Sequence, residues 1–189
     1  MTNIPTSDPF ALPPELATRG VLNLGCGHKH IAGAVNLDRT PATNPDVTHD
    51  LDSRPWPLPS DHFREVLAYD VVEHLADVLA GFEEIHRVCR AGATVRVTVP
   101  HFSSGNAFND PTHKHFFGYR AFECLTEEGE LSFYTGARFR LRHRQIIFWP
   151  TLVNKVVWRL ANRYPEWYEL RWAWMFPALF LSCELEVLK

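Results

Sequence analysis

The chain of 189 residues is long enough for one domain with a complete hydrophobic core and short for two. Hydrophobic residues make up 46% of the chain and charged residues 22%, the ordinary proportions of a globular protein. The formal net charge of -3 and the pI near 6.4 create no basic field that would attract nucleic acid, so nucleic acid is disfavoured as a partner.

Residues 1–19 contain four prolines and are predicted to form an extended arm, with one short helical turn at Pro14 to Thr18. They have neither a basic start nor a long apolar run, so we expect no signal peptide. The most apolar late stretch, Trp172 to Cys183, is roughly half as long as a membrane-spanning helix. The four cysteines form no CxxC pair and suit reduced thiols, so we expect a cytoplasmic protein without a transmembrane segment.

Short apolar runs in the first 70 residues predict a series of buried strands. The first run, Val21 to Leu24, stops at Gly25. Three further runs each end next to an aspartate, and they cover Ala34 to Leu37, Asp46 to His49 and Glu65 to Tyr69. The aspartates that close them are Asp38, Asp50 and Asp70.

Val71 to Arg90 is predicted to be a helix, because its apolar residues keep close to a 3.6-residue period and Gly92 follows. Ala93 to Val99 alternates between apolar and polar residues and predicts a strand, ended by Pro100. Later in the chain we expect strands at Phe139 to Trp149 and Leu181 to Leu188, separated by a helix at Leu152 to Arg163.

Strands interleaved with helices predict an α/β domain with a mostly parallel sheet and an antiparallel C-terminal edge. Only seven residues separate Gly27 from Val35, whereas a crossover helix needs about a dozen. The connection from Asp38 to Asp46 is equally short, so the first crossover helices are expected to be shortened or absent. We expect one domain over residues 20–189, following the N-terminal arm.

The glycine turn and the aspartates together indicate a ligand site. A glycine turn after a buried strand lets the backbone approach a ligand, and the acidic residue after the next strand can bind ribose hydroxyls. Carboxylates gathered at one edge of a parallel sheet suit a cationic, hydroxyl-rich cofactor better than a polyphosphate. No GK[ST] sequence follows the glycines, which argues against a nucleoside triphosphate.

The chain resembles the class I S-adenosylmethionine-dependent methyltransferases, and within them the small type-11 branch. The matching segments are LNLGCG at 22–27, NLD at 36–38, HDLD at 49–52, PLPSDHFREVLAYDVVEHL at 57–75 and VCRAGATVRVTVP at 88–100. The resemblance implies a Rossmann-like fold and a transferase with S-adenosylmethionine as cofactor and S-adenosylhomocysteine as product. One departure from the family is that its third glycine is replaced around His28 or Lys29.

The resemblance also implies roles for seven cofactor-binding residues. The turn beneath the methionine portion consists of Gly25, Cys26 and Gly27. Asp38 holds the ribose, and Asp70 faces the sulfonium and the amino group. The residues that meet the adenine are Asp50, through its carboxylate, and Leu51, through its backbone.

The segment Pro100 to Tyr119 follows the fifth predicted strand and is expected on the acceptor side, together with residues of about 150–180. Histidine beside a carboxylate is suited to removing a proton near pH 7. The predicted catalytic residues are His101, His113, His115 and Asp110. The same side chains are also suited to a divalent metal ion, and this alternative stays open with no metal ligand assigned.

Two residues of the predicted main helix are open to other interpretations. His74 is placed one turn after Asp70 and is interpreted either as a site residue or as a structural histidine. Glu73 is interpreted as a solvated or capping charge at the start of the helix.

The predicted function is transfer of a methyl group to a small-molecule O, N or S acceptor. A metal-assisted methyltransferase and a cofactor-binding module without catalysis stay open as alternatives, and an RNA or protein acceptor is disfavoured by the acidic balance. The aromatic residues of the C-terminal region are interpreted as core, as part of the acceptor pocket or as a subunit interface, which is compatible with a homodimer.

Overall fold

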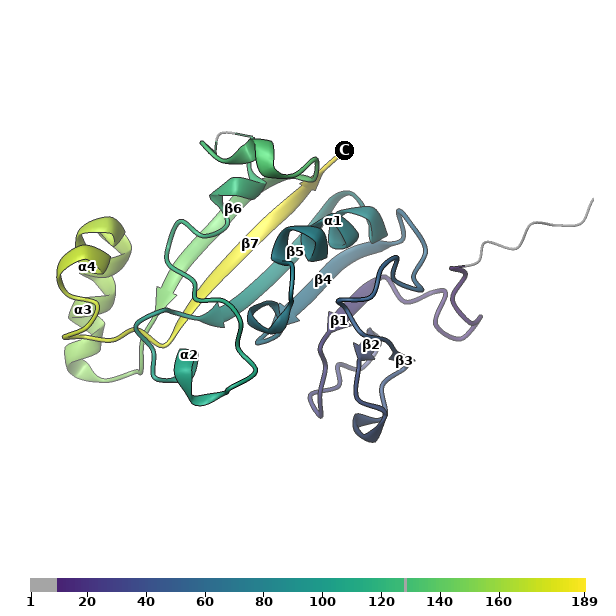
Figure 1. Ribbon diagram of the computed structural model, residues 1–189, viewed down its shortest axis with the longest axis horizontal. Helices are drawn as coiled ribbons and strands as arrows, with labels where there is room; N and C mark the ends of the chain where they lie inside the picture. Colours follow the sequence, from purple (N-terminus) through teal and green to yellow (C-terminus); the bar gives the residue numbers. More distant parts are fainter. Residues whose placement is uncertain (1–9, 128) are drawn as a thin grey trace, which may run out of the picture.

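A seven-stranded sheet forms the centre of the computed structural model, which describes residues 10–127 and 129–189 (Figure 1). The strands in chain order are β1 (Val21–Leu24), β2 (Val35–Asp38), β3 (Val47–Thr48), β4 (Phe63–Tyr69), β5 (Cys89–Pro100), β6 (Arg138–Ile147) and β7 (Phe180–Leu188). Their order in the sheet is β3-β2-β1-β4-β5-β7-β6. The first five strands run parallel, β7 is antiparallel to β5, and β6 is antiparallel to β7. The predicted α/β fold with an antiparallel C-terminal edge is confirmed.

The helices are α1 (Val78–Val88), α2 (Asn106–Asn109), α3 (Leu152–Arg163) and α4 (Pro165–Arg171). Short 3-10 turns occur at Pro41–Thr43, Val72–His74, Glu123–Leu125 and Ser132–Tyr134. In Figure 1, α1 lies over the middle of the sheet, whereas α3 and α4 lie together beyond the ends of β6 and β7. None of the helices in the described part of the chain is long and apolar enough to cross a membrane.

The expected shortening of the first two crossovers is confirmed. Within the described residues, no helix joins β1 to β2, and only the 3-10 turn Pro41–Thr43 lies between β2 and β3. The buried side chains of Asn23 and Asn36 pair across β1 and β2, with 2.9 Å between Nδ2 of Asn23 and Oδ1 of Asn36. Asn36 Oδ1 also accepts the N–H of Ile31 at 2.9 Å, and Asn23 donates to the carbonyl of Lys29 at 3.0 Å. Asn23 and Asn36 thus hold the backbone of the short connection between β1 and β2.

The main helix begins later than its apolar period predicted. Helix α1 starts at Val78 rather than Val71, and the chain before it is a 3-10 turn followed by extended backbone at Leu75. The side chain of Asp77 accepts the N–H of Ala80 at 3.0 Å and caps the first turn of α1. The buried apolar residues before Asp77 keep the helical spacing without forming a helix.

Both edges of the sheet are protected against further strand pairing. The edge strand β3 has only two residues. The opposite edge strand, β6, carries an arginine at every second position: Arg138, Arg140, Arg142 and Arg144. Its pairing with β7 shifts register between Leu141 and His143. Short strands, charges and bulges are the usual means of blocking a sheet edge.

Candidate functional site

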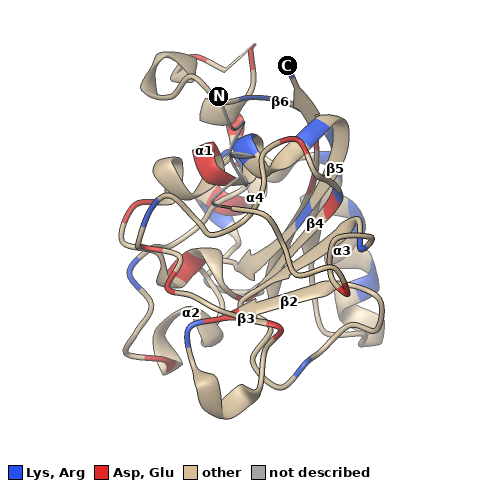
Figure 2. Cartoon of the chain, turned by 90° about the vertical axis from the view of Figure 1, so that its right-hand side faces the viewer, with Lys and Arg blue, Asp and Glu red and all other residues tan. Residues whose placement is uncertain are grey.

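A cavity of about 310 Å³ lies at the carboxyl ends of β1, β2, β3 and β4. Ligands of open parallel sheets bind at this edge. Six of the seven predicted cofactor-binding residues line the cavity, namely Gly25, Gly27, Asp38, Asp50, Leu51 and Asp70. Figure 2 views the molecule from the side of β2 and β3 and shows acidic residues beside β3. The cavity is therefore bordered by several carboxylates.

The turn after β1 requires glycine at Gly25 for two reasons. Its φ of 60° lies in the left-handed region, and a Cβ there would lie 2.4 Å from Cγ2 of Val71. Gly27 also has a positive φ, of 46°, but a Cβ at that position would meet no atom within 4 Å. The turn therefore packs tightly against Val71 on one side and leaves open space at Gly27.

Asp38, the last residue of β2, closes the glycine turn. Its Oδ2 accepts the N–H of Gly27 at 2.9 Å, and its Oδ1 accepts the N–H of Thr40 at 2.8 Å. A carboxylate has about four lone-pair positions, so Asp38 retains acceptor capacity toward the cavity. The residue thus both fixes the turn and offers oxygen atoms to a ligand.

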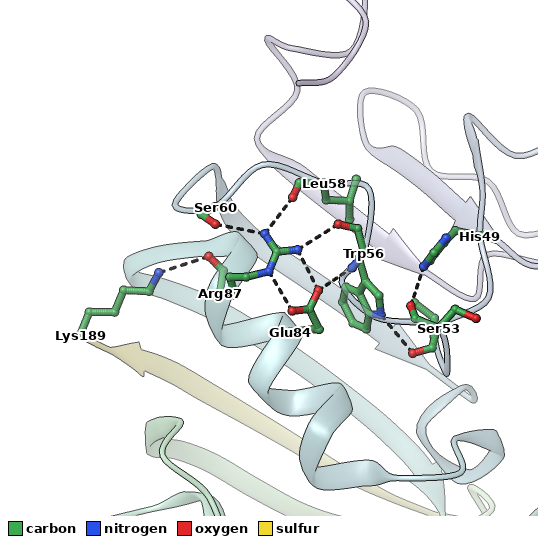
Figure 3. A network of polar contacts seen from close by, with 9 residues as sticks. His49, Ser53, Trp56, Leu58, Ser60, Glu84, Arg87 and Lys189 are labelled. Atoms are coloured by element: carbon green, nitrogen blue, oxygen red, sulfur yellow. Dashed lines mark hydrogen bonds and ion pairs between the residues drawn. The ribbon is translucent and has the colours of Figure 1, made fainter. Parts of the chain in front are cut away.

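Trp56 anchors the loop that carries Asp50 and Leu51, and Figure 3 shows how Trp56 itself contacts Glu84 and Arg87. The fully buried indole of Trp56 donates to the carbonyl of Leu51 at 3.0 Å. The backbone N–H of Trp56 donates to Glu84 of α1 at 2.7 Å, and Arg87 binds both oxygens of Glu84 at 2.8 Å. One face of α1 therefore holds the cavity loop in place.

Burial alone would raise the pKa of the Glu84 carboxyl. The bonds from Arg87 and from the backbone N–H of Trp56 outweigh that effect and lower this pKa below its ordinary 4.5. Glu84 is therefore ionised at neutral pH and charge-assisted bonds hold the anchor.

Asp70 occupies a conformation that is unusual for a non-glycine residue, with a φ of 55° at the end of β4. Its Oδ1 is buried and has no hydrogen-bond partner among the described residues. Its Oδ2 lies 3.7 Å from Nζ of the exposed Lys29. Strained backbone and an unpaired buried oxygen at a cavity wall are typical of a ligand-binding position.

Cys26 differs from the other predicted cofactor-binding residues because it does not line the cavity. It is buried, and its backbone N–H donates to the carbonyl of Leu37 at 3.0 Å. Burial, with a contribution from the nearby Asp38, raises the pKa of its thiol. Cys26 therefore supports the turn as a neutral side chain between its two glycines.

The predicted catalytic residues are only partly brought together. Asp110 lines the cavity, whereas His101, His113 and His115 do not. His101 is fully buried, with Nδ1 2.8 Å from Ser103 Oγ and Nε2 3.1 Å from Oε1 of Glu169.

His115 and His113 each use one ring nitrogen on a backbone carbonyl. His115 Nε2 lies 2.9 Å from the carbonyl of Leu75, and His113 Nδ1 lies 3.1 Å from the carbonyl of Ala107. Only His113 also approaches an acidic side chain near the cavity, since its Nε2 lies 4.0 Å from Oε1 of Glu73.

The interpretation of Glu73 as a solvated or capping charge is wrong, because its side chain is only 1% exposed. Burial, together with the nearby Asp70 and Asp110, raises the pKa of Glu73 to about 7. His74 does line the cavity, and burial, followed by the neighbouring His113, lowers the pKa of its imidazole. The adjacent Glu73 and His74 directly after a strand are the available sequence signal, but the helical period places Glu73 opposite the apolar face and therefore in solvent.

Neither the models of known protein families nor the sequences of curated proteins match this chain. Solved structures do. An S-adenosylmethionine-dependent methyltransferase from Mesorhizobium loti has a TM-score of 0.59 and 16% identity, covering 92% of this chain and 93% of that chain. A second S-adenosylmethionine-dependent methyltransferase, from Archaeoglobus fulgidus, has a TM-score of 0.59 and 18% identity, covering 92% of this chain and 88% of that chain. The chain has the fold of S-adenosylmethionine-dependent methyltransferases.

The methyltransferase fold does not by itself decide the reaction. The [4+2]-cyclase SpnF is also similar to this chain, with a TM-score of 0.57 and 14% identity over 89% of this chain and 74% of that chain. The chemistry therefore depends on the residues of the cavity.

Proposed function

We propose that the chain binds S-adenosylmethionine in the cavity described above and transfers its methyl group to a small-molecule acceptor through oxygen, nitrogen or sulfur. The observation that carries this proposal is the convergence of the glycine turn with Asp38, Asp50 and Asp70 on one cavity at the carboxyl ends of the strands. The fold of the chain supports the same cofactor.

The charges around the cavity suit this cofactor. Its lining includes five aspartates and a single arginine, namely Asp38, Asp50, Asp52, Asp70, Asp110 and Arg39. S-adenosylmethionine carries a positive sulfonium and a positive amino group, which carboxylates attract in a partly enclosed site. A polyphosphate would be repelled by the same lining.

The proposed contacts follow the order of the strands. Asp38 accepts hydrogen bonds from the ribose hydroxyls, and the Asp50–Leu51 loop meets the adenine through the Asp50 carboxylate and the Leu51 backbone. Asp70, whose buried Oδ1 has no partner among the described residues, faces the amino group and the sulfonium. The open side of Gly27 provides room for the methionine portion.

In the proposed reaction, a lone pair of the acceptor forms a bond to the methyl carbon while the carbon–sulfur bond breaks. The electron pair of that bond goes to sulfur, so the sulfonium becomes the neutral thioether of S-adenosylhomocysteine. The acceptor loses its proton to a base, and the protein mainly has to hold the two reactants in line. Asp110, His74 and His113 are the side chains that we propose for the acceptor side, because they lie in or next to the cavity wall. His101 is left out of this group because it is fully buried and both of its ring nitrogens are engaged. His115 is left out because it does not line the cavity and has no acidic partner there.

A small molecule is proposed as acceptor, rather than nucleic acid, because the chain has a net charge of -3 and the cavity is acidic. The four cysteines are all free thiols, and three of them are buried. Free thiols fit a reducing compartment, so we propose the cytoplasm as the site of action.

Calorimetry with S-adenosylmethionine and with S-adenosylhomocysteine tests the cofactor. We expect micromolar binding to the wild type and no measurable binding to Asp38→Ala, with the exposed Glu15→Ala as control. Thermal unfolding of each variant shows whether Asp38→Ala still folds. No heat with either ligand in the folded wild-type protein would refute the proposal, and binding without methyl transfer to any acceptor in a small-molecule library would reduce it to a cofactor-binding module.

A further inference from the structure

Three potential metal ligands meet behind the acceptor side of the cavity. They are Glu73 and His74, from the turn after β4, and His113, from the loop after α2. One ligand atom from each residue lies within 4.8 Å of the others. The rings of His74 and His113 also pack edge to face, with their centroids 4.7 Å apart.

Glu73 is the most deeply buried member of this cluster. Its side chain is 1% exposed, and no other residue of the described part of the chain gives either carboxylate oxygen a hydrogen bond. The closest charged or polar group of the cluster is His113 Nε2, 4.0 Å from Oε1. A buried carboxylate without partners costs free energy that a bound cation would remove.

Each of the two histidines uses one ring nitrogen in a hydrogen bond, and the other nitrogen of His113 faces this carboxylate. His113 Nδ1 lies 3.1 Å from the carbonyl of Ala107, which can only accept, so Nδ1 carries the proton and Nε2 keeps its lone pair. The hydroxyl of Thr112 donates to Asp110 at 2.7 Å, so it accepts from Nδ1 of His74 at 2.9 Å. His74 Nε2 therefore also keeps its lone pair.

This arrangement is the one that metal-binding histidines use. A ligating imidazole usually donates its other N–H to a carbonyl, or to an oxygen backed by a carboxylate, which fixes the ring and its tautomer. The carbonyl of Ala107 accepts the N–H of His113. The hydroxyl of Thr112, itself bound to the carboxylate of Asp110, accepts the N–H of His74. Asp110 is thereby a positioning residue for His74.

We propose that Glu73, His74 and His113 bind a divalent transition-metal ion at the wall of the cavity. Two imidazoles and one carboxylate form a ligand set that zinc and iron(II) use in enzymes, with open positions left for water or substrate. The nearby carboxylates of Asp70 and Asp110 add to the attraction for a cation.

The ligands need only a small inward movement. A tetrahedral ion with bonds of about 2.1 Å holds its ligand atoms about 3.4 Å apart. The separation of 4.0 Å between His113 Nε2 and Glu73 Oε1 is therefore slightly too long. The three ligand atoms all lie within 4.8 Å of one another, so the most distant pair has to approach by at most somewhat more than about 1 Å. We expect small rotations of the three side chains to supply this closure.

The metal site narrows the chemical class of the methyl acceptor, and this inference rests on the proposed methyltransferase function. His74 belongs to both the metal cluster and the cavity lining, so an open position of the ion is accessible from the cavity. A divalent ion polarises a bound hydroxyl or thiol and lowers its pKa, so that its proton leaves to water in the cavity, whereas the ion would occupy the lone pair with which an amine attacks. The acceptor we infer is therefore a compound that contacts the ion through a hydroxyl or a thiol, rather than an amine.

Titration with metal alone tests the site without any assay of activity. Protein treated with a chelator is titrated with Co²⁺, whose visible absorption reports nitrogen and oxygen ligands, and then with Zn²⁺ in competition. The wild type is expected to bind one equivalent, and Glu73→Gln and His113→Ala are expected to bind at least about a hundredfold more weakly. His143→Ala, which removes an exposed histidine of β6, is the matched control and should equal the wild type.

Variants of Thr112 separate positioning from simple packing. Thr112→Val removes the hydroxyl between His74 and Asp110 and should weaken Co²⁺ binding about tenfold, whereas Thr112→Ser keeps the hydroxyl and should restore it. Glu73→Gln has nearly the same shape as the native side chain, and thermal unfolding in chelator shows whether it is folded.

The proposal is overturned if the chelated wild type binds no Co²⁺, or if folded Glu73→Gln and His113→Ala keep the wild-type affinity and spectrum. Calorimetry of S-adenosylmethionine in chelator is run in parallel. Cofactor binding without metal binding removes only the metal site, whereas metal binding without cofactor binding removes the proposed function.

Discussion

The backbone N–H of Trp56 donates to the carboxylate of Glu84 at 2.7 Å, across 28 positions of the chain. This bond joins the loop that borders the cavity to helix α1, and Arg87 completes it from the next turn of the helix. The position of Asp50 and Leu51 therefore depends on two α1 residues that do not themselves line the cavity.

Glu84→Gln is expected to lower the free energy of unfolding by about 2 kcal/mol, because a buried, charge-assisted pair with Arg87 is lost. It should also weaken cofactor binding by loosening the Asp50–Leu51 loop. The control is Glu65→Gln, at a more exposed ion pair with Arg96, which should change stability by at most about 1 kcal/mol. Chemical denaturation measures the free energy of unfolding of both variants. Equal losses of stability in the two variants would contradict the role of Glu84 as an anchor of the cavity loop.

The same carboxylate predicts how stability depends on pH. The pKa of Glu84 is lower in the folded protein than its ordinary 4.5, so folding is favoured by this group above that value. Its contribution is lost as the pH falls from about 4.5 through the lowered pKa of the folded state, because the unfolded chain takes up the proton first. The difference in stability between wild type and Glu84→Gln should therefore be constant near neutral pH and shrink in acid. A difference that grows in acid would disprove this role.

Gly25→Ala and Gly33→Ala form a matched pair. Both glycines have a positive φ, of 60° and 78°, so both alanine variants bear the same kind of backbone strain. Only at Gly25 would the new Cβ also clash, 2.4 Å from Cγ2 of Val71. We expect about 1 kcal/mol of destabilisation at Gly33 and clearly more at Gly25, with loss of cofactor binding only there. Similar melting temperatures for the two variants would show that the turn relaxes around Val71.

Asp70→Asn tests the charge opposite the cofactor without straining the backbone, because asparagine tolerates a positive φ. We expect the affinity for S-adenosylmethionine to fall about tenfold or more, since a bond between charged groups is lost. The loss should be smaller for S-adenosylhomocysteine, which lacks the sulfonium charge. Equal affinities of wild type and variant for both ligands, measured by calorimetry, would place Asp70 away from the cofactor.

Sequence patterns predict the strands and bring six of the seven candidate cofactor residues to one edge of the sheet, because both depend on local spacing, whereas the cofactor roles of these residues stay predictions. The apolar runs and the aspartates that end them identify the carboxyl edge of the sheet, and the short connections identify the missing crossover helices. Helix Leu152–Arg163 was predicted with the bounds that the structure shows.

The acceptor side was harder to predict because it depends on contacts between distant segments. His101 follows the fifth strand as expected, yet Glu169, 68 positions later, binds its ring inside the protein. Glu73 was assigned to an ideal helix, whereas the left-handed backbone of Asp70 and the cap at Asp77 break that helix. The spacing of apolar residues continues through this break and does not reveal it. The contact between Glu73 and His113 could therefore not be inferred from the sequence spacing.

The arginines of β6 and the two-residue length of β3 limit how copies of this chain can associate. Two molecules that placed their β6 edges together would bring eight arginines close to one another, only partly balanced by Glu186 and Glu123, and β3 is too short to pair with a strand of a neighbouring molecule. A continuous sheet across two subunits is therefore disfavoured, and so is the growth of ordered aggregates from the native edges. Any homodimer has to form through side chains away from the strand ladder.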